Sequence, residues 1–218
     1  MGTIHEVRRE AKIKKFRTPP RPKGVQYKHL RPREDLTYDE VMRLIKAAEH
    51  VGRNRLRDGT MTLMAYVHAM RAIEICQLKW AQIDLSGRNP RIKVIRVKGS
   101  KDSDHPLDGE EVRRLRKLDA QSPDSQYVFA GETGNPLSVQ GLWQIVRRAG
   151  QVAGLPFSIH PHMLRHTCGQ QMLRDGVHLR LIQAWMGHED VKHTEHYTRV
   201  GTERFQKISL LRRGRKAA

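Results

Sequence analysis

Ile-His-Pro-His-Met-Leu-Arg-His-Thr-Cys, residues 159–168, is the segment from which the architecture is best worked out. Pro161 favours a helix start, because the first turn of a helix does not need its backbone N–H groups. His162 and Arg165 are three residues apart, so they share one face of the helix that follows. Leu164 points to another side and is expected to anchor the helix in the core. The segment therefore predicts a helix that carries chemistry on one face and packs through another.

A histidine-rich turn also occurs at metal sites, so this alternative has to be weighed. The spacing here matches no common zinc pattern, and no cysteine or carboxylate pairs with the histidines. The adjacent arginine would also repel a cation. The sequence holds no Walker loop and no paired carboxylates. We therefore expect neither a metal ion nor another cofactor.

Three further polar positions become informative beside this segment. Arg71 lies in an otherwise apolar helical pattern, where an unpaired charge would be costly, and Glu74 lies three residues later. Glu74 could form a structural ion pair, or it could support Arg71 while the guanidinium faces an anion; we expect both. His188 follows Gly187, which is expected to end a helix, and Tyr197 comes nine residues after His188. Alone, these last two would more often be a capping and a packing residue.

Taken together, six polar residues fit around one phosphate group. Two arginines can clamp the non-bridging oxygens of a phosphodiester through bidentate hydrogen bonds. A lysine and two histidines can move protons at neutral pH. A tyrosine hydroxyl can attack phosphorus and become covalently bound to it. The set is Arg71, Lys98, His162, Arg165, His188 and Tyr197. The chain is therefore predicted to cut and rejoin DNA.

The order of these motifs resembles the catalytic domain of the tyrosine recombinase (phage integrase) family, from about residue 36 to the C-terminus. The matching motifs, in chain order, are Met70-Arg71-Ala72-Ile73-Glu74, Lys98 before Gly99, His162-Met163-Leu164-Arg165-His166, Gly187-His188 and Tyr197-Thr198. The small fimbrial phase-variation recombinases, which lack the separate N-terminal core-binding domain of most integrases, are the most similar subgroup. This closer similarity rests on residues 159–168, Leu181-Ile182-Gln183 and His193-Thr194.

Two features depart from the family pattern. Ala69 stands where a glycine is usual before the first arginine motif. Asp102 and Asp104 make the segment after Lys98 less basic than in most members, which would weaken backbone contact there. Neither departure removes a catalytic group.

The resemblance implies a mechanism that agrees with the chemistry of the residues. Tyr197 attacks the scissile phosphate and forms a 3′-phosphotyrosyl bond with a free 5′-hydroxyl. Arg71 and Arg165 stabilise the charge that develops on phosphorus, and Lys98 protonates the leaving 5′-oxygen. No metal or nucleotide is needed, because the covalent bond conserves the energy of the phosphodiester. The remaining roles are general base on the tyrosine for His162, hydrogen-bond donor to a phosphate oxygen for His188, and support of the site for Glu74 and His166.

The resemblance also implies the partners. Four protomers on two double-stranded DNA sites would exchange strands through a Holliday junction, with accessory DNA-bending proteins as further partners. Two alternatives stay open. One is a DNA-binding regulator that has the fold without the reaction, and the other is a topoisomerase-like enzyme that relaxes DNA with the same tyrosine chemistry.

The composition agrees with a polyanionic partner. The 218 residues include 41 Lys and Arg against 23 Asp and Glu, a formal net charge of +18. Many ribosomal or membrane-surface proteins share such an excess. No signal peptide is recognisable, and no apolar run approaches the length of about 18 residues that a membrane span needs. Cys76 and Cys168 fall in apolar helical patterns. They are interpreted as small core residues without a disulfide, as is typical of a protein in a reducing compartment. We expect a soluble bacterial protein of the cytoplasm, not bound to a membrane and associated with the nucleoid when on DNA.

Three parts are expected along the chain. Residues 1–35 form a basic arm broken by prolines, since the first 33 residues hold eleven Lys or Arg against two Glu. Such an arm suits a segment that tracks a phosphate backbone, although a solvated tail would have the same composition. Residues 36–200 form the catalytic domain. Residues 201–218 form a basic tail whose apolar positions either dock on a neighbouring protomer or fold back onto their own core.

The expected fold class is mainly α with one small antiparallel β-sheet, the α+β fold of a tyrosine recombinase catalytic domain. Thr37 and Glu40 form a capping box at the start of the first helix. The apolar pattern shifts phase between positions 92/94 and 95/97, which leaves a bulge or a different register open. The remaining expected elements are helices over 60–70 and 72–80, strands over 92–97 and 105–107, helices over 112–118, 139–149 after a cap at Ser138, the 159–168 segment and 179–186, and a short helix bearing Tyr197.

Overall fold

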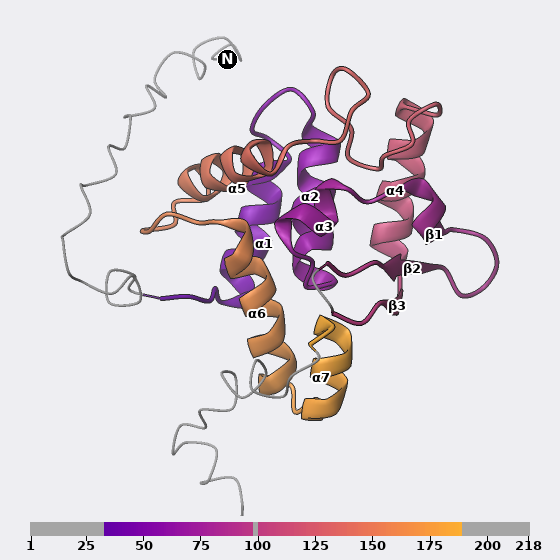
Figure 1. Ribbon diagram of the computed structural model, residues 1–218. Coiled ribbons are helices and arrows are strands. Elements are labelled where there is room, and N and C mark those ends of the chain that lie inside the picture. Colours follow the sequence, from indigo (N-terminus) through magenta and orange to yellow (C-terminus); the bar gives the residue numbers. More distant parts are fainter. Residues whose placement is uncertain (1–32, 98–99, 189–218) are drawn as a thin grey trace, which may run out of the picture. The chain divides into compact units, whose positions relative to one another are not determined.

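The computed structural model describes residues 33–97 and 100–188 of the chain (Figure 1). Within these ranges the protein is mainly helical with one three-stranded antiparallel sheet, in the order β1-β2-β3, which confirms the expected class. The helices are α1 (Tyr38–Ala48), α2 (Arg55–Val67), α3 (Ala72–Cys76), α4 (Gly109–Gln121), α5 (Val139–Val152), α6 (Pro161–Arg174) and α7 (Leu179–Met186). The strands are β1 (Ile83–Asp84), β2 (Arg91–Val94) and β3 (Ser103–Pro106), and a 3-10 turn, η3 (Trp80–Gln82), precedes β1.

The first helix starts where the capping pattern predicts. The Thr37 hydroxyl accepts a hydrogen bond from the backbone N–H of Glu40 at 3.3 Å, and the Glu40 carboxylate accepts one from the backbone N–H of Thr37 at 2.8 Å. The apolar face of α1, with Val41, Leu44 and Ala48, is fully buried. It packs against α2 and α5, and these helices with α6 enclose the main core (Figure 1).

Helix α2 is longer than the sequence suggests. It begins at Arg55 instead of near residue 60, so Gly59 lies inside its first turns. A Cβ atom at Gly59 would clash with the side chain of Glu49, which explains a glycine in a helix interior. The glycine lets the start of α2 approach the end of α1.

Helix α3 is shorter than expected and ends at Cys76 instead of running to residue 80. The chain turns there to pair with a distant segment. The carbonyl of Leu78 accepts from the backbone N–H of Val128 at 2.9 Å, and the N–H of Trp80 donates to the carbonyl of Gln126 at 3.2 Å. These long-range backbone bonds compete with continuation of the helix.

The sheet resolves the phase shift seen in the sequence. Ile92 and Val94 of β2 point inward and lie opposite His105 and Ser103 of β3. The strand ends at Val94, whereas Ile95 is 49% exposed. Instead of a bulge, the inward alternation continues with a buried arginine at position 96. Strand β1, which pairs with the other edge of β2, was not expected because two residues are too few to show a period.

Both cysteines are buried, as their apolar context predicts. Burial raises the pKa of the Cys76 thiol to about 12, and burial likewise raises that of Cys168 to about 12. Among the helices of the described ranges, none is long and apolar enough to cross a membrane.

Helices α6 and α7 lie side by side, and α7 also contacts β3 (Figure 1). Gly187 ends α7 with a left-handed φ of 65°, as the sequence predicts. Lys98 and Tyr197 lie outside the described residues, as do most of the predicted arm and the whole of the predicted tail.

Candidate active site

The first turns of α6 carry two of the predicted site residues. Pro161 is the first residue of the helix, as expected. Arg165 is 2% exposed, and its guanidinium donates to the carbonyl of Ala69, before α3, and to the carbonyl of Met186, at the end of α7, at 2.8 Å. This one side chain therefore joins three segments that are far apart in sequence.

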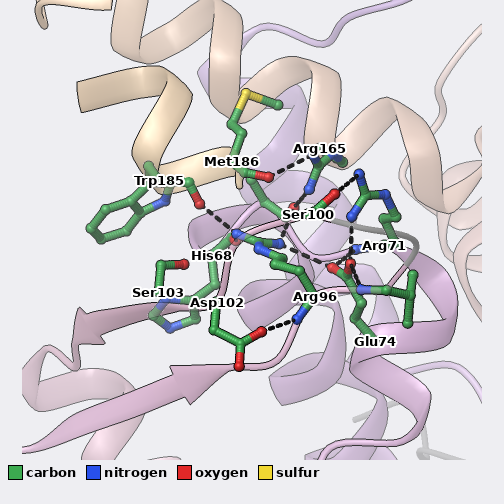
Figure 2. A network of polar contacts seen from close by, with 12 residues as sticks. His68, Arg71, Glu74, Arg96, Ser100, Asp102, Ser103, Arg165, Trp185 and Met186 are labelled. Carbon is green, nitrogen blue, oxygen red and sulfur yellow. Dashed lines mark hydrogen bonds and ion pairs between the residues drawn. The ribbon is translucent and has the colours of Figure 1, made fainter. Parts of the chain in front are cut away.

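Arg71 precedes the first residue of α3 and faces the same place from the other side (Figure 2). Its backbone N–H donates to one carboxylate oxygen of Glu74 at 2.8 Å, and its guanidinium pairs with the other at 2.6 Å. The expected ion pair is thus present. The far end of the guanidinium donates to the hydroxyl of Ser100 at 3.1 Å, and the side chain is 29% exposed. Arg71 is held firmly and still reaches solvent.

The Glu74 carboxylate is buried and ionised. Burial alone would raise its pKa, but the hydrogen bond from the backbone of Arg71, the charge of Arg96 and the Arg71 guanidinium together lower the pKa below its ordinary value. The carboxylate also accepts the backbone N–H of Val97 at 3.3 Å. One buried anion therefore fixes both Arg71 and the residue before Lys98.

Arg96 is not among the site residues predicted from the sequence. Its guanidinium is fully buried and donates to Glu74 at 3.0 Å (Figure 2). A signal was available, because every second residue of an extended chain points to the same side, and residues 92, 94 and 96 all point inward. The apolar residues alone set the expected phase of the strand, so a charged residue was not expected at an inward position.

Histidine side chains crowd the exposed edge of the site. The rings of His162 and His166, one turn apart on α6, meet edge to face with centroids 5.0 Å apart. Part of His162 reaches solvent, yet the groups packed around its ring, followed by the charges of His166, Arg165 and Arg71, lower its pKa to about 4. His162 is therefore neutral at pH 7 in the free protein and able to accept a proton.

His188 follows Gly187 at the end of α7. Its backbone N–H donates to the carbonyl of Gln183 at 3.0 Å, and its own carbonyl accepts from the Gln183 amide at 3.1 Å. A Cβ atom at Gly187 would lie 2.8 Å from the carbonyl of Lys101 and 2.9 Å from the Arg96 side chain. The end of α7 thus lies directly against Arg96 and Lys101.

The segment around Lys98 is anchored on both sides. Val97 binds Glu74, and Ser100 binds Arg71. Asp102, which was expected only to reduce the basic character of this segment, accepts the backbone N–H of Arg96 at 2.9 Å. Its carboxylate therefore has a structural role in shaping the loop.

The described residues thus bring Arg71, His162 and Arg165 together, with Glu74 and His166 beside them and His188 at the adjoining helix end. Among these residues, no group of three or more His, Cys, Asp or Glu side chains is arranged to hold a metal ion.

The model of the phage integrase family matches residues 34–204, a range that includes both Lys98 and Tyr197. The chain belongs to the phage integrase family. The proposed cluster thus lies within the part of the chain that defines the family.

Relatives of the chain share this family. The type 1 fimbriae regulatory protein FimB of Escherichia coli K12 is 38% identical over 188 residues, which cover 84% of this chain and 92% of FimB. This match confirms the similarity to the fimbrial subgroup. The crystal structure of XerA recombinase superposes with a TM-score of 0.67 at 28% identity, over 79% of this chain and 62% of XerA. A lambda integrase tetramer bound to a Holliday junction shares the fold, with a TM-score of 0.58 at 22% identity, over 75% of this chain and 47% of that one.

Proposed function

We propose that this phage integrase family member is a site-specific DNA recombinase that cleaves and rejoins strands through a 3′-phosphotyrosine intermediate. The observation that carries the proposal is the meeting of Arg71 and Arg165 from distant segments, both fixed by buried partners, beside a neutral histidine. Two guanidinium groups arranged before substrate arrives suit a phosphodiester whose transition state gains negative charge.

In the proposed cleavage step, the Tyr197 oxygen attacks phosphorus and loses its proton to His162. A bond forms between that oxygen and phosphorus, and the bond from phosphorus to the 5′-oxygen breaks. Lys98 gives a proton to the departing 5′-oxygen, which leaves as a hydroxyl. Arg71 and Arg165 hold the non-bridging oxygens, and His188 donates a further hydrogen bond to them.

Rejoining is the same step in reverse. The 5′-hydroxyl of a partner duplex attacks the phosphotyrosine bond and releases Tyr197, so no external energy source is required. Glu74 orients Arg71 through its ion pair, and His166 supports the ring of His162 from the next turn of α6.

The proposed assembly is a tetramer on two double-stranded DNA sites that passes through a Holliday junction. The tetrameric lambda integrase complex, which shares the fold, supports this arrangement. We assign residues 1–35 to a DNA-tracking arm, 36–200 to the catalytic domain and 201–218 to a basic tail that either docks on a neighbouring protomer or folds back onto its own core. The protein would act in the bacterial cytoplasm on the nucleoid, with accessory DNA-bending proteins at its sites.

The test begins by finding the DNA that the protein cleaves. Sheared genomic DNA of the source bacterium is incubated with the full chain, and fragments covalently trapped on the protein are sequenced. Two copies of the recovered site are then placed on one plasmid. Wild-type protein should give recombinant plasmids, and Tyr197→Phe should bind the site normally but give no covalent adduct on a nicked suicide duplex.

The other outcomes separate the alternatives. Relaxed topoisomers without recombinants would identify a topoisomerase-like activity. Specific binding without any adduct from wild-type protein would identify a non-cleaving regulator. An adduct that survives in Tyr197→Phe would overturn the assignment of the nucleophile.

A further inference from the structure

Arg96 is a further enclosed charge near the site, and the proposed chemistry does not use it. The residue as a whole is 6% exposed, and its side chain is 0% exposed. Burial lowers its pKa, and Glu74 opposes the shift. A guanidinium in such a place must be satisfied by the protein, because leaving it unpaired would cost several kcal/mol.

The partners of Arg96 come from three separate segments (Figure 2). One nitrogen donates to the Glu74 carboxylate at 3.0 Å and to the carbonyl of Ala69 at 3.2 Å. The other donates to the carbonyl of His68 at 3.2 Å and to that of Trp185. The two acceptors before α3, the carboxylate on α3 and the carbonyl near the end of α7 are therefore tied to one side chain.

Each of these partners lies close to a proposed catalytic group. Ala69 is two residues before Arg71, and its carbonyl also accepts from Arg165. Glu74 is shared between Arg96 and Arg71. Trp185 is three residues before His188, and Arg96 itself is two residues before Lys98. The positions of Arg71, of Arg165 and of the chain that leads to His188 therefore depend on contacts that converge here.

The end of α7 is held from a second direction. The Trp185 ring stacks on His105 of β3 with centroids 3.7 Å apart, and its indole N–H donates to the carbonyl of Val67 at 3.0 Å. These contacts keep the helix in place, so removal of Arg96 would release the local positions of the Trp185 and His68 carbonyls without detaching α7. Removal of Arg96 would therefore misalign the proposed catalytic groups while α7 stays packed in its place.

We propose that Arg96 is a positioning residue for strand cleavage. It sets Arg71 through the shared Glu74 carboxylate, and it sets the start of the His188 loop through the Trp185 carbonyl, without contacting DNA. This inference rests on the proposed recombinase function and adds to it a residue outside the six that would contact the phosphate.

The test compares Arg96→Met and Arg96→Lys with Arg91→Met. Arg91 is a matched control because it is an arginine on β2, five residues before Arg96, and its side chain is exposed. Adduct formation is followed in a single turnover on the nicked suicide duplex, together with duplex affinity and thermal unfolding. Arg96→Met should slow cleavage by about 10², the cost expected when catalytic groups are misplaced by about 1 Å. Arg96→Lys should give an intermediate rate, and Arg91→Met the wild-type rate.

Two readouts distinguish positioning from a general loss of structure. Duplex affinity should be unchanged in both Arg96 variants, because the side chain is buried. Millimolar guanidinium should partly restore cleavage by Arg96→Ala, by filling the vacated position, whereas the same concentration of sodium chloride should not.

The outcomes are decisive in each direction. Wild-type cleavage rates in a folded Arg96→Met protein would overturn the inference, as would a parallel loss of duplex affinity. Failure of both Arg96→Lys and Arg96→Met to fold would also overturn it in favour of a purely structural role. If wild-type protein itself forms no adduct, the proposed function fails, and this result is distinct from all of the preceding ones.

Discussion

At the scale of single residues, the backbone of Ala69 is a point of strain at the site. Its φ of 49° is left-handed, a conformation that costs a residue with a Cβ about 1–2 kcal/mol. Its carbonyl accepts from both Arg96 and Arg165. These charge-assisted bonds hold the conformation, so this chain tolerates an alanine where the family usually has glycine.

The lowered pKa of His162 leads to a prediction on pH dependence. A general base with a pKa of about 4 stays neutral down to mildly acidic pH. The second-order rate constant for adduct formation, which reports the free protein, should fall by less than about twofold between about pH 7.5 and about pH 5.5. If the base were a histidine with the ordinary pKa of about 6.5, this rate constant would fall about tenfold over the same range. Duplex affinity measured at both pH values is the control, and an acid limb centred near 6.5 would contradict a general base of lowered pKa at this position.

At the scale of elements, the junction between α7 and the loop after β2 depends on a missing side chain. Gly187→Ala meets both a left-handed φ of 65° and a carbonyl only 2.8 Å from the new Cβ. The free energy of unfolding should therefore fall by more than the roughly 1 kcal/mol of backbone cost alone, and cleavage should slow because the end of α7 is pushed off Arg96. Urea unfolding and the suicide-duplex assay measure the two effects.

Gly176→Ala supplies the matched control for this change. Gly176 has a left-handed φ of 80°, but nothing lies within 4 Å of the position that an added Cβ atom would take. The Gly176→Ala variant should lose only the backbone contribution to the free energy of unfolding, and it should cleave DNA at the wild-type rate. Equal losses at both glycines would show that close packing at the α7 junction contributes nothing.

The buried pair of His68, at the end of α2, and His105, on β3, predicts how stability depends on pH. His105 contacts His68, which binds the Glu111 carboxylate, and Arg96 lies nearby. Burial, then the charges of His68 and Arg96, lower the pKa of His105 to about 3. Since the unfolded chain binds a proton more readily than the folded one, stability falls as the pH drops below about 6.5. The contribution of His105 is a loss of about 1.4 kcal/mol between about pH 7.5 and about pH 5.5.

Urea unfolding at these two pH values measures this loss. His105→Gln should show a smaller acid-induced fall in unfolding free energy than wild type. His50→Gln, which changes an exposed histidine of the first helix region, should keep the wild-type dependence. The same fall in all three proteins would show that His105 does not titrate as expected.

Elements with local signals were predictable from the sequence, whereas those set by distant contacts were not. The Thr37 cap and the Gly187 stop are encoded within a few residues, and both are confirmed. The early end of α3 depends on backbone pairing with residues 126–128, which no local pattern reveals. The Arg71–Glu74 pair was foreseen from its spacing. Arg96 was missed because its role arises from three segments that meet only in the folded protein.

At the scale of the whole molecule, the basic arm is expected to act through charge alone. Removal of residues 1–31 takes away ten Lys and Arg against two Glu. Affinity should fall for all duplexes alike, and the plot of log K against log salt should become flatter, because each phosphate contact contributes about 0.9 to the slope. Binding titrations at several salt concentrations test this. A chain with the arm sequence scrambled should behave as wild type, and a truncated chain with an unchanged slope would show that the arm is passive.

The two buried cysteines make the protein convenient for labelling experiments. Thiolates are the reactive form of cysteine, and both thiols of this chain are enclosed and have pKa values of about 12. Native protein should therefore react with a thiol reagent only after unfolding, when two equivalents are consumed. A single cysteine introduced as Ala217→Cys would then take up a fluorophore selectively in the wild-type background. Energy transfer between donor- and acceptor-labelled copies mixed on DNA would report whether the C-terminal tail reaches a neighbouring protomer.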